Sequence, residues 1–171
     1  WNEAKPFQIE DAEFVVRNGR VVVGHKTGLG KTFISLLAWS RWTNARKALL
    51  IGTLGSVATW MYLLDKWAGA RGTFLRGYSD SNWKKAINAR EGIFFCTYST
   101  FLGLMKATPG KPAFDVLFTD ELHKYLRHKT STHKAIARLD TENYVGLSAT
   151  RGSKGPQDLW PVLNIANRNM F

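Results

Sequence analysis

Short runs of mainly apolar residues recur along the chain, and most of them are followed by glycine, serine, threonine or aspartate. Runs of this kind are typical of strands that are buried on both faces, because neither face carries polar side chains. They are also too short for ordinary helices. The sequence therefore predicts buried strands at residues 21–23, 48–51, 72–76, 93–97, 116–119 and 144–147.

Segments with apolar residues at helical spacing lie between these runs. We expect Ser56 and Ser81 to be N-caps of two of the resulting helices. The expected helices are residues 8–17, 32–42, 60–67, 81–87, 133–139 and 159–165, with a shorter one around residues 101–102. Alternation of strands and helices predicts an α/β domain with a mainly parallel sheet covered by helices. In such sheets ligands bind beyond the carboxyl ends of the strands.

The chain has 171 residues, which favours a single domain over residues 1–171. Its single cysteine, Cys96, excludes an internal disulfide. No apolar run approaches the roughly 20 residues needed to cross a bilayer. The first five residues do not resemble a signal peptide. We therefore expect a protein of the cytoplasm, nucleoid or nucleus that is neither secreted nor bound to a membrane.

The net charge of +11 is large for this length and favours a polyanionic partner. Part of the positive charge is clustered: residues 124–138 carry five lysines and arginines and no acidic residue. Such a cluster is more typical of nucleic-acid binding than a diffuse excess of charge. The alternative is a solvated surface that only keeps the protein soluble.

A glycine-rich segment joins the first predicted strand to the following helix. Its backbone amides can point at phosphate oxygens, and the helix start adds a positive dipole end. The residues expected to hold the nucleotide are Thr27, Gly28, Leu29, Gly30, Lys31 and Thr32. Lys31 would reach the β- and γ-phosphates, and Thr32 would bind Mg²⁺. The general pattern has glycine where this chain has His25, so a glycine-rich turn without a ligand stays an alternative.

Two consecutive carboxylates, Asp120 and Glu121, follow the predicted strand at residues 116–119. Asp120 would bind Mg²⁺, and Glu121 would orient or deprotonate the attacking water. A helix cap or solvated turn is the alternative for an isolated Asp-Glu pair. Ser148 and Thr150 follow the last predicted strand and could form hydrogen bonds to His123. Alone, they would indicate an ordinary turn.

The ordered set Gly-Leu-Gly-Lys-Thr, Asp-Glu-Leu-His and Ser-Ala-Thr resembles motifs I, II and III of superfamily II helicases. The phosphate loop is similar to that of the Swi/Snf-type translocases, which also lack the first Walker glycine. Gln8 resembles the glutamine of the Q motif, which reads adenine. Residues 49–54 with Trp60 resemble motif Ia, and residues 95–100 resemble motif Ib. Leu122 departs from the alanine that is common in motif II, and Ser-Ala-Thr departs from the Swi/Snf form of motif III.

This resemblance implies the first of two RecA-like lobes, with a three-layer α/β fold that binds ATP and Mg²⁺. It implies a helicase or translocase that hydrolyses ATP to move along nucleic acid, with duplex DNA favoured. His123 would act in catalysis and, with Ser148 and Thr150, would couple the nucleotide to the nucleic acid. A second lobe, in the same or another chain, would complete the site. The expected nucleic-acid contacts are Thr53, Thr97, Tyr98, Lys129 and Lys134.

Two other functions share parts of this pattern. A small P-loop kinase or GTPase would use the same phosphate loop, although an Asp-Glu-Leu-His box followed by Ser-Ala-Thr has no role there. A module that binds nucleic acid or a partner protein without turning over ATP is the other alternative.

Overall fold

The computed structural model describes residues 3–77, 80–122, 130–149, 161 and 163–167. Within these residues the strands form one sheet in the order β1-β6-β5-β2-β4-β3, and every neighbouring pair is parallel. The strands are β1 (Arg20–Val23), β2 (Lys47–Gly52), β3 (Thr73–Phe74), β4 (Gly92–Thr97), β5 (Ala113–Thr119) and β6 (Asp140–Leu147).

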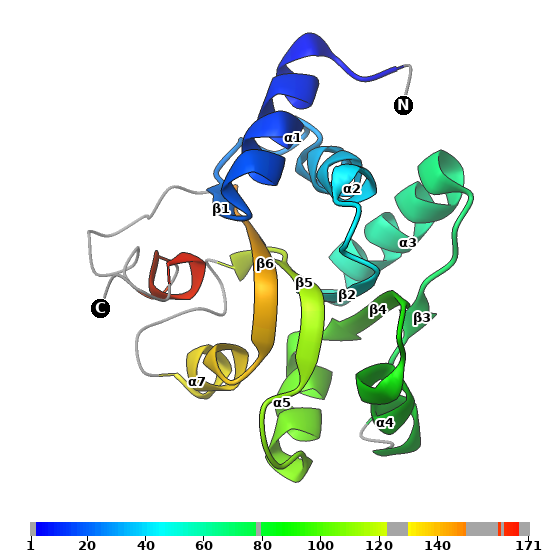
Figure 1. The fold of residues 1–171 in the computed structure, drawn as a ribbon, viewed down its shortest axis with the longest axis vertical. Helices are drawn as coiled ribbons and strands as arrows, with labels where there is room; N and C mark the ends of the chain where they lie inside the picture. The colour runs from blue at the N-terminus through cyan, green and yellow to red at the C-terminus, as the bar shows by residue number, and fades with distance from the viewer. Residues whose placement is uncertain (1–2, 78–79, 123–129, 150–160, 162, 168–171) are drawn as a thin grey trace.

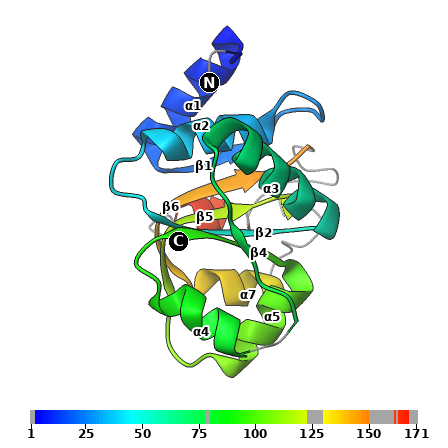
Figure 2. The ribbon, with the colours of Figure 1, turned by 90° about the vertical axis from the view of Figure 1, so that its right-hand side faces the viewer.

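Helices cover both faces of the sheet, which gives three layers (Figures 1 and 2). One face is covered by α1 (Pro6–Asn18), α2 (Lys31–Arg41) and α3 (Leu54–Ala68). The other face is covered by α4 (Asp80–Asn88), α5 (Tyr98–Ala107) and α7 (Ser131–Ala137). Residues 161 and 163–166 are also helical. The expected α/β class with a parallel, helix-covered sheet is confirmed.

The core lies in two parts, one on each side of the sheet. Alternate residues of β2 belong to different parts: Ala48 and Leu50 pack toward α1, α2 and α3, whereas Leu49 and Ile51 pack toward α4, α5 and α7. Each of these four residues is completely buried. The continuous apolar runs therefore have the physical cause expected from the sequence, because both faces of the strand need apolar side chains.

Two helix starts differ from the sequence-based expectation. The N-cap of α3 is Thr53, whose side chain accepts a hydrogen bond from the Ser56 amide, so Ser56 lies inside the helix rather than capping it. Helix α4 begins at Asp80, so Ser81 is its second residue and also lies inside the helix rather than capping it. The predicted third strand is shortened to Thr73–Phe74. Part of the expected helix at 159–165 lies outside the described residues.

The parallel arrangement brings the carboxyl ends of the strands to one edge of the sheet. Val23 of β1 pairs with Leu147 of β6, and Thr119 of β5 pairs with Gly146 of β6. The polar segments that follow β1, β6 and β5 therefore start side by side. In the part of the chain that the structure describes, no helix is both long and apolar enough to cross a membrane.

Candidate functional site

Residues 24–30, hereafter the phosphate loop, connect β1 to α2 at the carboxyl edge of the sheet. Gly28 and Gly30 have φ angles of 83° and 77°, in the left-handed region that favours glycine. The Lys31 Nζ donates hydrogen bonds to the carbonyl oxygens of His25 at 2.8 Å and Lys26 at 3.1 Å. The lysine thus turns back over the loop that precedes it, at the start of a helix whose dipole favours anions.

Helix α1 brings Gln8 against the phosphate loop. The Gln8 Nε2 donates to the Leu29 carbonyl oxygen at 3.3 Å, and its Oε1 accepts from the Lys5 amide at 3.0 Å. A Cβ atom at Gly30 would collide with the Gln8 Nε2 and displace it, and the positive φ angle of Gly30 separately favours glycine at this position. The structure therefore brings the predicted adenine-reading residue to the predicted phosphate-binding segment.

A second contact between α1 and the phosphate loop was not expected from the sequence. The His25 Nε2 lies 2.8 Å from the Asp11 Oδ2, and the ring centroids of Phe7 and His25 are 6.3 Å apart. Asp11 is three residues after Gln8, so both side chains lie on one face of the helix. That spacing is the only sequence signal that could have indicated the pair. His25 thus contacts α1 where the general loop pattern has glycine.

Residues 120–121, hereafter the acidic loop, follow β5. Asp120 as a residue is 7% exposed. Its carboxylate accepts two hydrogen bonds, from the Trp60 Nε1 to Oδ2 at 3.1 Å and from the Glu121 amide to Oδ1 at 2.8 Å. Burial raises the pKa of Asp120, whereas these two hydrogen bonds and the charge of Lys31 oppose the rise. The charge of Lys31 acts on Asp120, so the phosphate loop and the acidic loop lie near each other at the carboxyl edge of the sheet.

Glu121 has a φ angle of 54°, in the left-handed region, and is the only non-glycine residue with positive φ among the described residues. A residue with a Cβ atom rarely adopts this conformation, because the side chain approaches the backbone too closely. Such outliers persist where surrounding contacts hold them, and they are frequent at functional sites. The half-buried Glu121 is therefore held in an unusual backbone state directly after Asp120.

The third predicted motif, which starts at Ser148, follows the strand that lies in the sheet between the strands of the other two motifs. Strand β6 lies between β1 and β5, and Ser148 follows it. The Ser148 amide donates to the Val23 carbonyl oxygen at 3.2 Å, and its side chain is buried. His123, the expected hydrogen-bond partner of Ser148 and Thr150, lies outside the described residues, as does Thr150.

The predicted nucleic-acid residues fall into three groups. Thr53 and Thr97 are the N-caps of α3 and α5. They lie at the carboxyl ends of the neighbouring strands β2 and β4, since Gly52 pairs with Thr97. Lys134 is exposed on α7, and Lys129 lies outside the described residues. The expectation for Tyr98 is corrected: its side chain is 2% exposed, and its hydroxyl donates to the Asp120 carbonyl oxygen at 2.8 Å. Tyr98 therefore supports the acidic loop from inside the protein, because so little of it reaches the surface.

The side chains expected to hold Mg²⁺ are the hydroxyl of Thr32, at the start of α2, and the carboxylate of Asp120. Both supply oxygen, the donor that Mg²⁺ prefers. No group of three or more His, Cys, Asp or Glu side chains forms a metal site within the described residues. Mg²⁺ is commonly bound through one or two protein groups together with substrate phosphates, so this donor set fits the ion.

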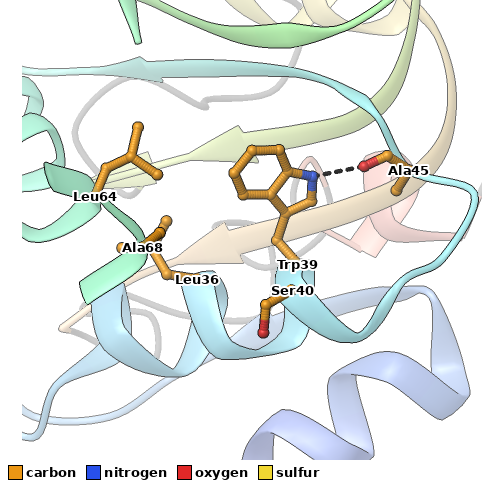
Figure 3. Close-up of a pocket in the computed structure, with 6 residues that line it drawn as sticks. All are labelled: Leu36, Trp39, Ser40, Ala45, Leu64 and Ala68. Carbon is orange, nitrogen blue, oxygen red and sulfur yellow. Dashed lines mark hydrogen bonds between the residues drawn. The ribbon is translucent and has the colours of Figure 1, made fainter. Parts of the chain in front are cut away.

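A separate hollow of about 190 Å³ lies between α2 and α3, lined by Leu36, Trp39, Ser40, Ala45, Leu64 and Ala68 (Figure 3). Its one indole N–H, on Trp39, is already bonded to the Ala45 carbonyl oxygen at 2.8 Å. Ligand pockets usually measure roughly 300–1,000 Å³. The small, mainly apolar hollow therefore does not compete with the carboxyl edge as the nucleotide site.

Comparisons with known proteins identify the fold and the family of the chain. No curated protein matches the chain. A solved structure, the Sulfolobus solfataricus SWI2/SNF2 ATPase core in complex with dsDNA, has the same fold with a TM-score of 0.81 and 21% sequence identity. The match covers 96% of this chain but only 36% of that chain. The expected RecA-like fold is thereby confirmed. The profile of the family described as "Type III restriction enzyme, res subunit" (ResIII) matches residues 4–152, so the chain belongs to the ResIII family.

Proposed function

We propose that this chain is the ATP-binding lobe of a nucleic-acid-dependent ATPase, which hydrolyses ATP to move along or remodel DNA. The observation that carries the proposal is the convergence of the phosphate loop, the acidic loop and Ser148 at one edge of β1, β5 and β6. A phosphate-binding loop beside a carboxylate is the arrangement that phosphoryl transfer to water requires. Membership of the ResIII family supports the same function.

Each residue of the site has a distinct proposed role. Gln8 contacts adenine, and the amides of residues 27–30 together with Lys31 hold the phosphates. Lys31 would exchange its bonds to the loop carbonyls of His25 and Lys26 for bonds to the β- and γ-phosphates. The Thr32 hydroxyl and the Asp120 carboxylate hold Mg²⁺, which when bound neutralises charge on the phosphates.

The proposed hydrolysis uses Glu121 as the group that orients and deprotonates water. The water oxygen forms a bond to the γ-phosphorus, and its proton moves to the Glu121 carboxylate. The bond between the γ-phosphorus and the bridging oxygen breaks, and ADP leaves with the electron pair. The positive φ angle of Glu121 supports this assignment, because it turns the backbone sharply right after the metal-binding residue.

Steady-state phosphate release, measured with and without duplex DNA in a protein that holds both lobes, tests the proposal. The wild type should hydrolyse ATP faster with DNA, whereas Glu121→Gln should bind ATP normally and lose turnover. The substitution keeps the shape of the side chain and removes the charge that accepts the proton. Nucleotide binding without hydrolysis in the wild type would instead indicate a binding module.

Nucleic acid is the proposed partner because the chain carries a net charge of +11 and has two capped helix starts, at Thr53 and Thr97, side by side on the carboxyl edge. The matched Sulfolobus structure was solved with dsDNA, which supports duplex DNA as the substrate. If the lobe contacts about three phosphates, log K against log salt should have a slope of roughly −2.7. A salt-independent affinity would contradict this partner.

A further inference from the structure

The Asp120 carboxylate is held by a residue that lies far away in the sequence. The Trp60 Nε1 donates to the Asp120 Oδ2 at 3.1 Å, and the Trp60 side chain is completely buried. The Trp60 ring packs on Phe118, with ring centroids 5.0 Å apart, so its orientation is fixed by the core. The indole N–H therefore reaches the carboxylate from a rigid position.

The direction of this contact follows from helix geometry. Thr53 caps α3 at the carboxyl edge, and Trp60 lies seven residues further on, about two turns into the helix. Side chains on a helix lean toward its N-terminus, so the Trp60 ring leans back toward the carboxyl edge. Asp120 lies at that level, since its amide donates to the Ile51 carbonyl oxygen at 2.9 Å.

The backbone of Asp120 is fixed as well. The Tyr98 hydroxyl donates to the Asp120 carbonyl oxygen at 2.8 Å, and Tyr98 is the first residue of α5. The carboxylate is thus held at Oδ2 by Trp60 of α3 and at Oδ1 by the Glu121 amide, while the main chain is held by β2 and α5. With these contacts in place, rotation of the Asp120 side chain would break the bond to Trp60.

We propose that Trp60 is a positioning residue for the metal-binding carboxylate of Asp120. Its indole N–H occupies one side of Oδ2 and leaves the remaining lone pairs of the carboxylate for Mg²⁺. Groups that orient a metal ligand through a hydrogen bond typically change metal affinity roughly 10–100-fold when they are removed. This inference rests on the proposed function, because it takes Asp120 as the Mg²⁺ ligand.

Trp60→Phe removes the N–H and keeps an aromatic ring against Phe118. A matched control exists: Trp83 is also buried, and its Nε1 donates to the Thr108 Oγ1 at 2.7 Å, away from the acidic loop. Calorimetric titration of each variant with ATP, in the presence and absence of Mg²⁺, measures how much Mg²⁺ strengthens binding. We expect Trp60→Phe to reduce that gain roughly tenfold, and Trp83→Phe to leave it unchanged.

The Mg²⁺-free titration separates positioning from general damage, because a purely structural defect weakens binding under both conditions. In an Asp120→Asn background, Trp60→Phe should cause no further loss of the Mg²⁺-dependent gain, since the ligand is already removed. An equal loss in Trp60→Phe and Trp83→Phe, or an undiminished effect of Trp60→Phe in the Asp120→Asn background, would overturn the inference.

A measurement on the wild type decides the question if Trp60→Phe does not fold. The indole N–H proton resonance of Trp60 should move when Mg-ATP is added and move less with ATP alone, whereas that of Trp83 should stay in place. An unchanged Trp60 resonance at saturating Mg-ATP would overturn the inference. If the wild type does not bind Mg-ATP at all, the proposed function itself fails and this inference fails with it.

Discussion

The phosphate loop and the acidic loop follow strands β1 and β5, which both pair with β6, yet the protein holds the two loops differently. Residues 26–29 are exposed, and the hydrogen bonds that the phosphate loop accepts from Gln8 and Lys31 go to its backbone carbonyls. Asp120 is buried and is held by the side chains of Trp60 and Tyr98. The first loop depends mainly on local backbone conformation, with Gln8 and Asp11 of α1 against its outer side chains and carbonyls, whereas the second depends on buried side chains that tertiary folding brings together.

Supplying a second lobe should have the largest effect, because both loops belong to one lobe. Charge that develops on the γ-phosphate needs a cation from the opposite side, and an arginine finger contributes roughly 10³–10⁵ in rate in GTPases. Arg151 is the nearest candidate in this sequence but lies outside the described residues. Phosphate release by this 171-residue chain with saturating duplex DNA should therefore rise by orders of magnitude once the second lobe is added. Equal rates would show that one lobe is sufficient.

Lys31→Ala tests the phosphate loop. Hydrogen bonds to charged groups contribute roughly 1.5–3 kcal/mol, so we expect Mg-ATP affinity to fall roughly 10- to 150-fold. The free energy of unfolding should change little, because the Lys31 Nζ forms its hydrogen bonds with the loop carbonyls of His25 and Lys26 rather than with the core. Calorimetric titration measures the affinity, with exposed Lys26→Ala as the control. Unchanged affinity in Lys31→Ala would remove this lysine from the site.

Gly30→Ala and Gly28→Ala separate backbone strain from side-chain contact within the phosphate loop. Both glycines have positive φ, so each substitution should destabilise the loop by roughly 1–2 kcal/mol. Only Gly30→Ala would also displace Gln8, since nothing lies within 4 Å of a Cβ atom at Gly28. We expect Gly30→Ala to bind ATP about three- to tenfold more weakly than Gly28→Ala, through loss of one hydrogen-bonded contact. Equal affinities would contradict the proposed role of Gln8.

Tyr98→Phe tests the acidic loop and should have the smallest effect. The substitution removes the hydrogen bond to the Asp120 carbonyl oxygen and keeps the ring, so the free energy of unfolding should fall by about 1 kcal/mol. Urea unfolding measures this change, and Tyr62→Phe is the control because Tyr62 is 62% exposed. Equal stability of the two variants would show that Tyr98 does not hold the acidic loop.

Much of the fold follows from the apolar pattern. The expected strands at residues 48–51, 93–97 and 116–119 lie within the observed β2, β4 and β5, because strands buried on both faces need continuous apolar runs. The cap of α3 was less predictable. Thr53 and Ser56 both have side chains that can cap a helix, and the end of β2 at Gly52 selects Thr53.

The sequence by itself determined the α/β class, the order of the motifs and the glycine positions of the phosphate loop, because these depend on neighbours along the chain. Tertiary structure alone decided which distant residues support the site. The Trp60–Asp120 and Asp11–His25 contacts join residues 60 and 14 positions apart in the numbering, and the burial of Tyr98 reversed its expected role. The roles of Lys31, Thr32, Glu121 and Ser148 stay predictions. Side-chain contacts across a sheet depend on register and packing, which no local pattern encodes.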